Sequence, residues 1–342
     1  MLDIYRIRDT RDYSEFKKIS IFKYKISDLN KLFFNNIINQ KINYSIIILI
    51  ELHCSGHLSS IIKILIKIYF NFINLKNPNL FHYFMRRILH LQDLLLEYKK
   101  KEYINTRNNQ EIRNLLCELT AILTFCPKSN LFIAKSLPKV KESVNLKSNR
   151  LDYIYTIEKS IIGENIEDDD LRMYLNEIIY LLLESKNYEK LMYIYLSVKK
   201  QYKDMELFHK IIFKIVMYYI DNVNQQKQIY IKLLIQNYSN KLLNKPIREK
   251  IVFMIFYVYL NKINFYKNII YQDEGVLLVS SKINILYKNF NDKIDKIYLE
   301  DVKEKHQEKK AEIIIKKNKV DDEDIKIRNR MDILNNINFF KK

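Results

Sequence analysis

The 342-residue sequence is short of the residues that make tight turns, with 3 glycines, 4 prolines and no tryptophan. Hairpin turns, phosphate-binding loops and nucleophile elbows depend on glycine, because it adopts positive φ without strain. The glycines stand at Gly56, Gly163 and Gly275, so neither G-x-x-x-x-G-K-[ST] nor G-x-S-x-G occurs. This scarcity argues against most open-sheet nucleotide enzymes and leaves helices joined to helices.

Cysteines and long apolar runs are also scarce. Cys54, Cys117 and Cys126 form no C-x-x-C pair, and their odd number argues against a disulfide framework. We therefore expect a reducing, intracellular compartment, either cytoplasmic or nuclear. The first 20 residues are rich in charge and lack the apolar region of a secretory signal. The longest apolar run, Ile251–Leu260, falls short of the roughly 20 residues that cross a bilayer, so we expect no membrane partner.

Positive charge is in excess, with 58 Lys and Arg against 40 Asp and Glu, which gives a formal net charge of +18. Two interpretations are open. The excess can serve an anionic partner. It can also follow from A/T-rich codons, which encode the abundant Lys, Asn, Ile and Tyr. Hydrophobic residues make up 48% of the chain, enough to fill a sizeable core.

Apolar periodicity predicts an all-α protein with two helical arrays. In the first array we expect helices at Tyr44–Cys54, Leu58–Ile73, Leu80–Tyr98 and Ile112–Phe125, with a polar loop at Lys99–Gln110. In the second we expect them at Leu171–Ser185, Tyr188–Tyr202, Glu206–Asp221, Gln226–Tyr238 and Pro246–Leu260. The predicted divisions are a lead-in helix in 1–40, a helical domain in 41–150, a second array in 151–290 and a charged, partly disordered or helical tail in 291–342.

No constellation of residues indicates catalysis. His53 and His57 have the i,i+4 spacing of two metal ligands on a helix. Ser55-Gly56 lies between them, however, and Gly56 is expected to end the helix in a left-handed conformation. We therefore predict helix-turn packing at these histidines, no metal site, no cofactor and no enzymatic activity.

Basic residues are the more promising candidates. Exposed cations bind nucleic-acid phosphates without regard to sequence, although lysine on a solvated helix surface is also the norm. The candidate nucleic-acid contacts are Arg86, Arg87, Lys128, Lys135, Lys139 and Lys141.

Two segments together resemble a known family. They are IIILIELHCSGHLSSIIKILIKIYFNFINLKNP (Ile46–Pro78) and LCELTAILTFCPKSNLFIAKS (Leu116–Ser136). In this order they resemble the C-terminal helical domain of the MgsA/RarA/Werner-interacting-protein family, which belongs to the clamp-loader clade of AAA+ ATPases. The matching positions are Ser55, Gly56, Pro78, Pro127, Lys128, Ser129 and Asn130.

The resemblance covers roughly residues 40–145 and departs from the family in two respects. The acidic residues of the family pattern fall on Asn71 and Phe72, and its glycine falls on Asn74. The ATPase module that precedes this domain in the family has no counterpart here, because the chain has no Walker motif.

What the resemblance implies is a collar-like helical domain that oligomerises and associates with replication or recombination proteins at DNA. We expect a non-enzymatic accessory of DNA replication or repair, acting as a homo-oligomer or beside a separate ATPase. The alternative is an α-solenoid scaffold for protein–protein interaction without DNA binding.

Overall fold

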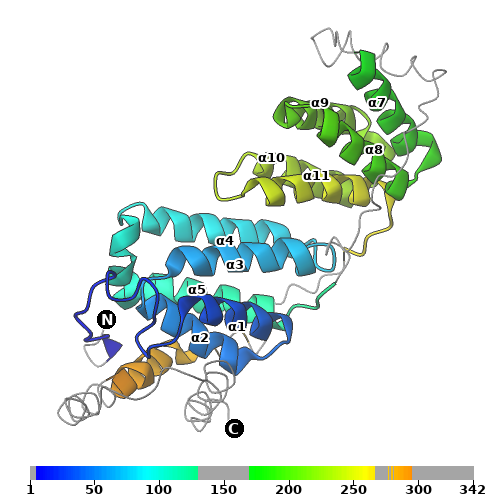
Figure 1. Cartoon of the computed structure of the whole chain (residues 1–342). Coiled ribbons are helices and arrows are strands. Elements are labelled where there is room, and N and C mark those ends of the chain that lie inside the picture. Colours follow the sequence, from blue (N-terminus) through cyan, green and yellow to red (C-terminus); the bar gives the residue numbers. More distant parts are fainter. Residues whose placement is uncertain (1–4, 130–168, 266–275, 277–278, 280, 295–342) are drawn as a thin grey trace, which may run out of the picture. The chain divides into compact units, whose positions relative to one another are not determined.

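The structure, a computed structural model, describes residues 5–129, 169–265, 276, 279 and 281–294 (Figure 1). All regular secondary structure in these residues is helical, and an antiparallel bridge between Ile19 and Lys25 is isolated. The predicted all-α class is thereby confirmed. The chain divides into two compact units. Unit 1 comprises Met1–Tyr69, Leu80–Lys128 and Asn268–Lys342, and unit 2 comprises Phe70–Asn79 and Ser129–Lys267.

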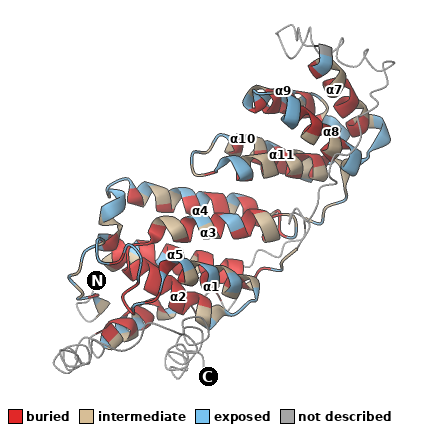
Figure 2. Ribbon diagram, in the orientation of Figure 1, coloured by how far each residue is buried: buried red, intermediate tan, exposed pale blue. Residues whose placement is uncertain are grey.

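Unit 1 is organised around two buried helices, α2 and α5, which pack on each other and on α1 and α3 (Figure 2). Every residue from Ser45 to Cys54 of α2 is buried, as expected of a helix that is apolar on all sides. No helix in the described part of the chain is both long and apolar enough to cross a membrane. The α-helices of unit 1 before residue 129 are α1 (Ile26–Ile38), α2 (Ile42–Cys54), α3 (Leu58–Ile68), α4 (Leu80–Leu95) and α5 (Gln110–Phe125).

The turn between α2 and α3 confirms the predicted role of Gly56. Its φ is +79°, and its N–H donates to the His53 carbonyl at 2.9 Å. The His57 N–H donates to the Leu52 carbonyl at 2.9 Å, which completes a Schellman motif. A Cβ atom on Gly56 would lie 3.0 Å from the Tyr13 ring, so the position also lacks room for a side chain.

Unit 1 differs from the prediction at two places. The predicted polar loop at 99–110 is instead a 3₁₀ helix, η3 (Lys100–Asn108), whose Thr106 and Arg107 are buried. Residues 281–294 form a helix of unit 1, and its Phe290 packs on Phe22 with 4.8 Å between ring centroids. The predicted boundary between residues 290 and 291 therefore cuts through a helix.

Unit 2 contains the second array, and its predicted helices are confirmed with ends within three residues. Four of its helices begin after an Asn or Asp whose side chain accepts the N–H three residues on, namely Asn187, Asp204, Asn224 and Asn244. Its elements are α7 (Asp169–Tyr180), η6 (Leu181–Ser185), α8 (Tyr188–Gln201), α9 (Met205–Tyr218), η7 (Ile220–Asn222), α10 (Gln225–Tyr238) and α11 (Lys245–Leu260).

Unit 2 also includes Phe70–Asn79, a segment that the sequence places between α3 and α4. The Tyr230 hydroxyl donates to Asn74 Oδ1, and both residues are buried. Asn79 Nδ2 donates to the Phe265 carbonyl at 2.8 Å. The predicted 41–150 domain thus contains ten residues that pack with the second array. The segment begins within a π turn, η2 (Tyr69–Ile73), where the sequence predicted a continuous α-helix.

Candidate nucleic-acid interface

Arg86 is accessible to solvent, as a residue that contacts nucleic acid must be. It is exposed on α4, on a stripe with His82, Leu89 and Asp93 that points away from the buried positions of the helix. This spacing of three and four residues is the solvent face of an amphipathic helix.

Arg87, one residue further on, is half-buried and its charge is already neutralised. Its Nε donates to Glu118 Oε1 at 2.9 Å, its Nη2 pairs with Oε2, and the Tyr83 hydroxyl donates to the same carboxylate. The hydrogen bond to Glu118 raises the pKa of Arg87 further. This arginine joins α4 to α5, so we leave it out of the interface.

Lys128 is also engaged within the chain. Its Nζ donates to the Thr124 carbonyl in the last turn of α5, an interaction that helix C-termini favour. Burial lowers its pKa to about 8. The remaining three candidates, Lys135, Lys139 and Lys141, lie outside the described residues.

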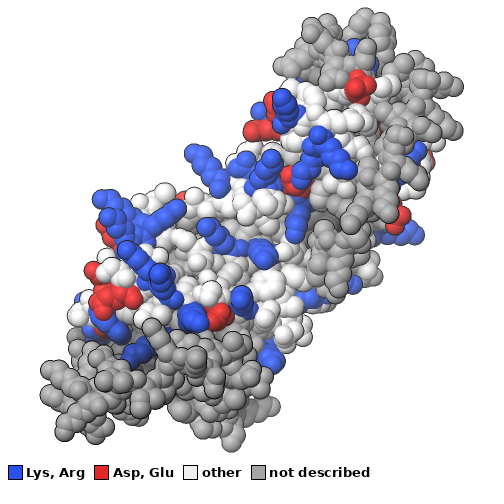
Figure 3. Space-filling view, in the orientation of Figure 1, with Lys and Arg blue, Asp and Glu red and all other residues white. Residues whose placement is uncertain are grey.

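Exposed cations on α3 and at the start of η3 were missing from the candidate set. Lys63 and Lys67 form an i,i+4 pair on the outer face of α3, and Lys67 Nζ lies 5.1 Å from the centre of the Phe34 ring. Figure 3 shows Lys and Arg side chains standing over α3 and α4. We call the exposed set the basic surface: Lys63, Lys67, Arg86, Lys99, Lys100 and Lys101.

Few acids accompany the basic surface. Asp93 and Glu97 are the exposed carboxylates on α4 and the turn after it, and Glu102 in η3 is half-buried. The exposed Glu111 of α5 lies 3.0 Å from Nε2 of His90 on α4. Among the ion pairs of the described residues, none involves a member of the basic surface. The i,i+4 spacing of Lys63 and Lys67 was the sequence signal that could have added α3 to the candidates.

The residues of the family resemblance have structural roles where they are described. Ser55 caps the end of α2, and its Oγ accepts the Ile21 N–H at 3.0 Å. Pro78 is buried in the turn before α4 and Pro127 is exposed after α5. The Ser129 N–H donates to the Phe72 carbonyl at 2.6 Å. Asn130 lies outside the described residues.

His53 is buried in a chain of hydrogen bonds rather than in an open site. Its Nδ1 lies 2.6 Å from the Tyr287 hydroxyl and its Nε2 lies 3.1 Å from Thr106 Oγ1. Thr106 donates its hydroxyl proton to the Tyr103 carbonyl, so we infer that it accepts from Nε2–H and that Tyr287 donates to Nδ1. Burial lowers the pKa of His53 to about 3, which keeps the ring neutral.

His57 has hydrogen-bond partners different from those of His53. Its Nε2 bonds the Phe16 carbonyl at 2.7 Å. All three cysteines are buried and free, and burial raises the pKa of Cys54 and of Cys117 to about 12. Within the described ranges no three His, Cys, Asp or Glu residues are grouped as a metal site. The two histidines are buried and pack around the turn between α2 and α3, as the sequence predicted. The three cysteines are buried as well.

Comparison with known proteins gave no match to a protein-family model, to a curated protein or to a solved structure. The resemblance to the MgsA/RarA/Werner-interacting-protein family is therefore still a prediction from the quoted residues.

Proposed function

We propose that the protein is a non-enzymatic accessory of DNA replication or repair that oligomerises and binds DNA through the basic surface. The observation that carries this proposal is the set of six exposed cations on α3, α4 and the start of η3, none of which is engaged in an ion pair among the described residues. Cations that form no ion pair among the described residues exchange counterions for phosphates, which favours binding to a polyanion.

The test is DNA binding at several salt concentrations with the full chain. We expect the affinity for a duplex of random sequence to fall linearly on a log–log plot, with a slope of about −0.9 per neutralised phosphate. The triple change Lys63→Glu, Lys67→Glu and Arg86→Glu should reduce the magnitude of that slope by about 2–3 and weaken binding at low salt.

A matched variant controls for total charge. Lys200→Glu, Lys203→Glu and Lys241→Glu alter three exposed lysines of unit 2 and change the net charge by the same amount. The proposal requires this variant to bind much more tightly than the α3–α4 variant. Equal losses in the two variants, or no binding by the wild type at low salt, would contradict it. Sedimentation of the wild type tests oligomerisation separately.

The second candidate function is an α-solenoid scaffold that binds proteins and not DNA. It is favoured by the succession of helices in unit 2, where α7 packs on α8 and α10 on α11. The salt titration separates the two, because a scaffold of this kind has no steep salt-dependent affinity for DNA.

A further inference from the structure

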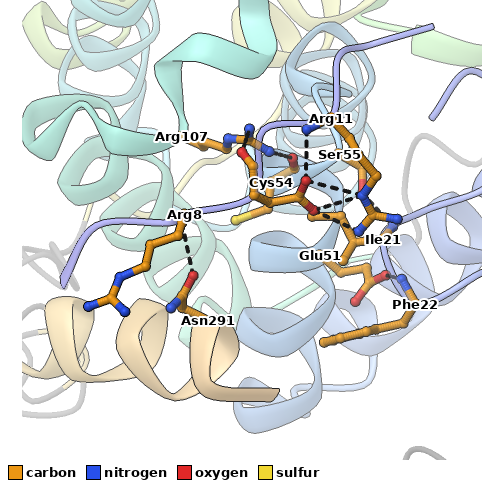
Figure 4. A network of polar contacts seen from close by, with 10 residues as sticks. Arg8, Arg11, Ile21, Phe22, Glu51, Cys54, Ser55, Arg107 and Asn291 are labelled. Carbon is orange, nitrogen blue, oxygen red and sulfur yellow. Dashed lines mark hydrogen bonds and ion pairs between the residues drawn. The ribbon is translucent and has the colours of Figure 1, made fainter. Parts of the chain in front are cut away.

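The first described residues of unit 1 are recognised through their main chain by side chains from elsewhere in that unit. Asn108 makes a paired contact with Ile7: its Oδ1 accepts the Ile7 N–H at 2.8 Å and its Nδ2 donates to the Ile7 carbonyl at 3.1 Å. Asn291 Oδ1 accepts the Arg8 N–H at 3.0 Å (Figure 4). A side-chain amide that bonds both the N–H and the C=O of one residue makes the same two hydrogen bonds that a neighbouring β-strand would make.

Two buried arginines bind the main chain of residues on either side of Ile7 and Arg8. Arg113 Nη1 donates to the Tyr5 carbonyl at 3.0 Å, and Arg107 Nη2 donates to the Asp9 carbonyl. Residues 5–9 are the N-terminal segment. We call the side chains that bind its main chain the docking site: Arg107, Asn108, Arg113 and Asn291.

The side chains of residues 6–9 alternate between exposed and buried positions, which is the pattern expected of a bound extended peptide. Ile7 is 2% exposed and the Asp9 side chain is 4% exposed, whereas Arg6 and Arg8 are exposed. Burial would raise the pKa of Asp9, but hydrogen bonds from Arg11 outweigh it and lower the pKa, so the carboxylate is ionised. The two buried side chains of the segment are therefore an apolar residue, Ile7, and an acid two positions later, Asp9.

The docking site is held in place by contacts of its own. Arg113 Nε donates to the Arg107 carbonyl at 2.6 Å, and its Nη2 donates to Asn108 Oδ1 at 2.9 Å. Its guanidinium lies 4.1 Å from the centre of the Tyr287 ring. The donors that face the segment are therefore positioned by neighbours other than the segment, which lowers the cost of binding a guest.

We propose that the docking site is a peptide-binding site. Its partner is an extended segment of another protein with an apolar residue, an Asp or Glu two positions later and an Arg two positions after that acid, because the Asp9 carboxylate is bonded by Arg11 of its own segment. The chain's own residues 5–9 occupy the site in cis until such a segment displaces them. Main-chain recognition supplies affinity, and the two inward side chains supply selectivity, as in recognition by strand addition. The buried cations Arg107 and Arg113 favour an acidic guest over a basic one. This inference does not depend on DNA binding.

The test uses the full chain with Ile7→Asp, which weakens the cis occupant without changing the docking site. The probe is a fluorescein-labelled synthetic peptide of residues 3–11, followed by fluorescence anisotropy. We expect at least tenfold tighter binding to the Ile7→Asp chain than to the wild type, since the wild-type segment competes. Adding Asn108→Ala to that chain should remove the binding. A peptide N-methylated at the Ile7 nitrogen, or one with Ile7→Asp or Asp9→Asn, should bind more weakly.

Equal binding to the wild type and the Ile7→Asp chain, or binding unaffected by Asn108→Ala, overturns the proposal. If Ile7→Asp does not fold, the wild-type chain with a protease site inserted after Thr10 gives a second measurement. After cleavage the N-terminal fragment should co-elute with the rest of the chain and be displaced by excess unlabelled peptide. A fragment that leaves at once, or that excess peptide does not displace, contradicts it.

Discussion

Glu51 is a buried carboxyl group that costs unit 1 stability when it ionises. It is 2% exposed, and it accepts hydrogen bonds from the Phe22 N–H at 3.0 Å and from the Ser20 hydroxyl. Burial raises its pKa to about 7, and the two hydrogen bonds offset only part of that effect.

Glu51→Gln should therefore remove a pH dependence. The folded-state pKa of about 7 lies above the ordinary 4.5, so the folded state binds the proton more tightly and loses stability as pH rises through this window. Glutamine keeps the acceptor for Phe22 and does not titrate. We expect the variant to match the wild type at pH 5 in urea unfolding and to exceed it at pH 8, by about 1–3 kcal/mol. Glu97→Gln, at an exposed position, is the control, and parallel curves for Glu51→Gln and the wild type would disprove the prediction.

At the residue scale, the sequence could predict which side chains are exposed but not which residue each one binds. Arg86 and Arg87 are neighbours in a basic pair, yet one is exposed and the other is bound to Glu118, 31 positions away. Helical periodicity places Arg87 at the edge of the buried face, but only the packing of α4 on α5 brings the carboxylate to it.

At the scale of helices and turns, features set by neighbours in sequence were predictable. Apolar spacing located the helices, and Gly56 marked where one of them stops. The helix η3 was missed because its sequence is polar and its order comes from tertiary contacts, such as that of Thr106 with His53. The π turn at the end of α3 has no comparable local signal.

Gly56→Ala should destabilise unit 1 by about 1–2 kcal/mol or more. The residue has φ +79°, and the added Cβ would meet the Tyr13 ring at 3.0 Å. Chemical denaturation measures the loss. Tyr13→Ala in the same background relieves the contact but not the backbone strain, so it should recover only part of the stability.

Lys186→Gly should act in the opposite direction. Lys186 follows η6 in a left-handed conformation with φ 48°, which strains a residue that has a Cβ. Relief of strain exceeds the entropy that glycine adds to the unfolded chain, so we expect a gain of up to about 1 kcal/mol. Lys203→Gly, outside such a conformation, is the comparison, and a loss of stability in Lys186→Gly would refute the prediction.

At the scale of the whole molecule, each unit is assembled from segments that are distant in sequence. Unit 2 takes in Phe70–Asn79, and unit 1 takes in the helix at 281–294. Local patterns predicted the end of a helix and a break within Phe70–Asn79 but no helix at 281–294, and they carry no information about which distant partner each segment packs against. The predicted boundaries were therefore drawn where composition changes, and the structure divides the chain elsewhere.

Asn74→Ala tests how much the distant segment contributes to unit 2. The change removes the acceptor of the Tyr230 hydroxyl, which is buried, so we expect a loss of about 1–3 kcal/mol. A double-mutant cycle with Tyr230→Phe should give a coupling free energy of about 1 kcal/mol. A coupling of zero would show that the two side chains contribute independently.

The bond between His53 and Tyr287 spans 234 positions, and it has a consequence for biosynthesis. A ribosome makes α1 to α5 first, then nearly all of unit 2, and only afterwards the helix that carries Tyr287. During that interval the nascent chain holds His53 and Arg113 without the aromatic ring that covers them. Unit 2 can therefore mature during translation, whereas unit 1 must wait for the helix at 281–294. A stop codon shortly before residue 281 should accordingly yield a product that chaperones and proteases treat as unfinished, although most of its helices have been synthesised.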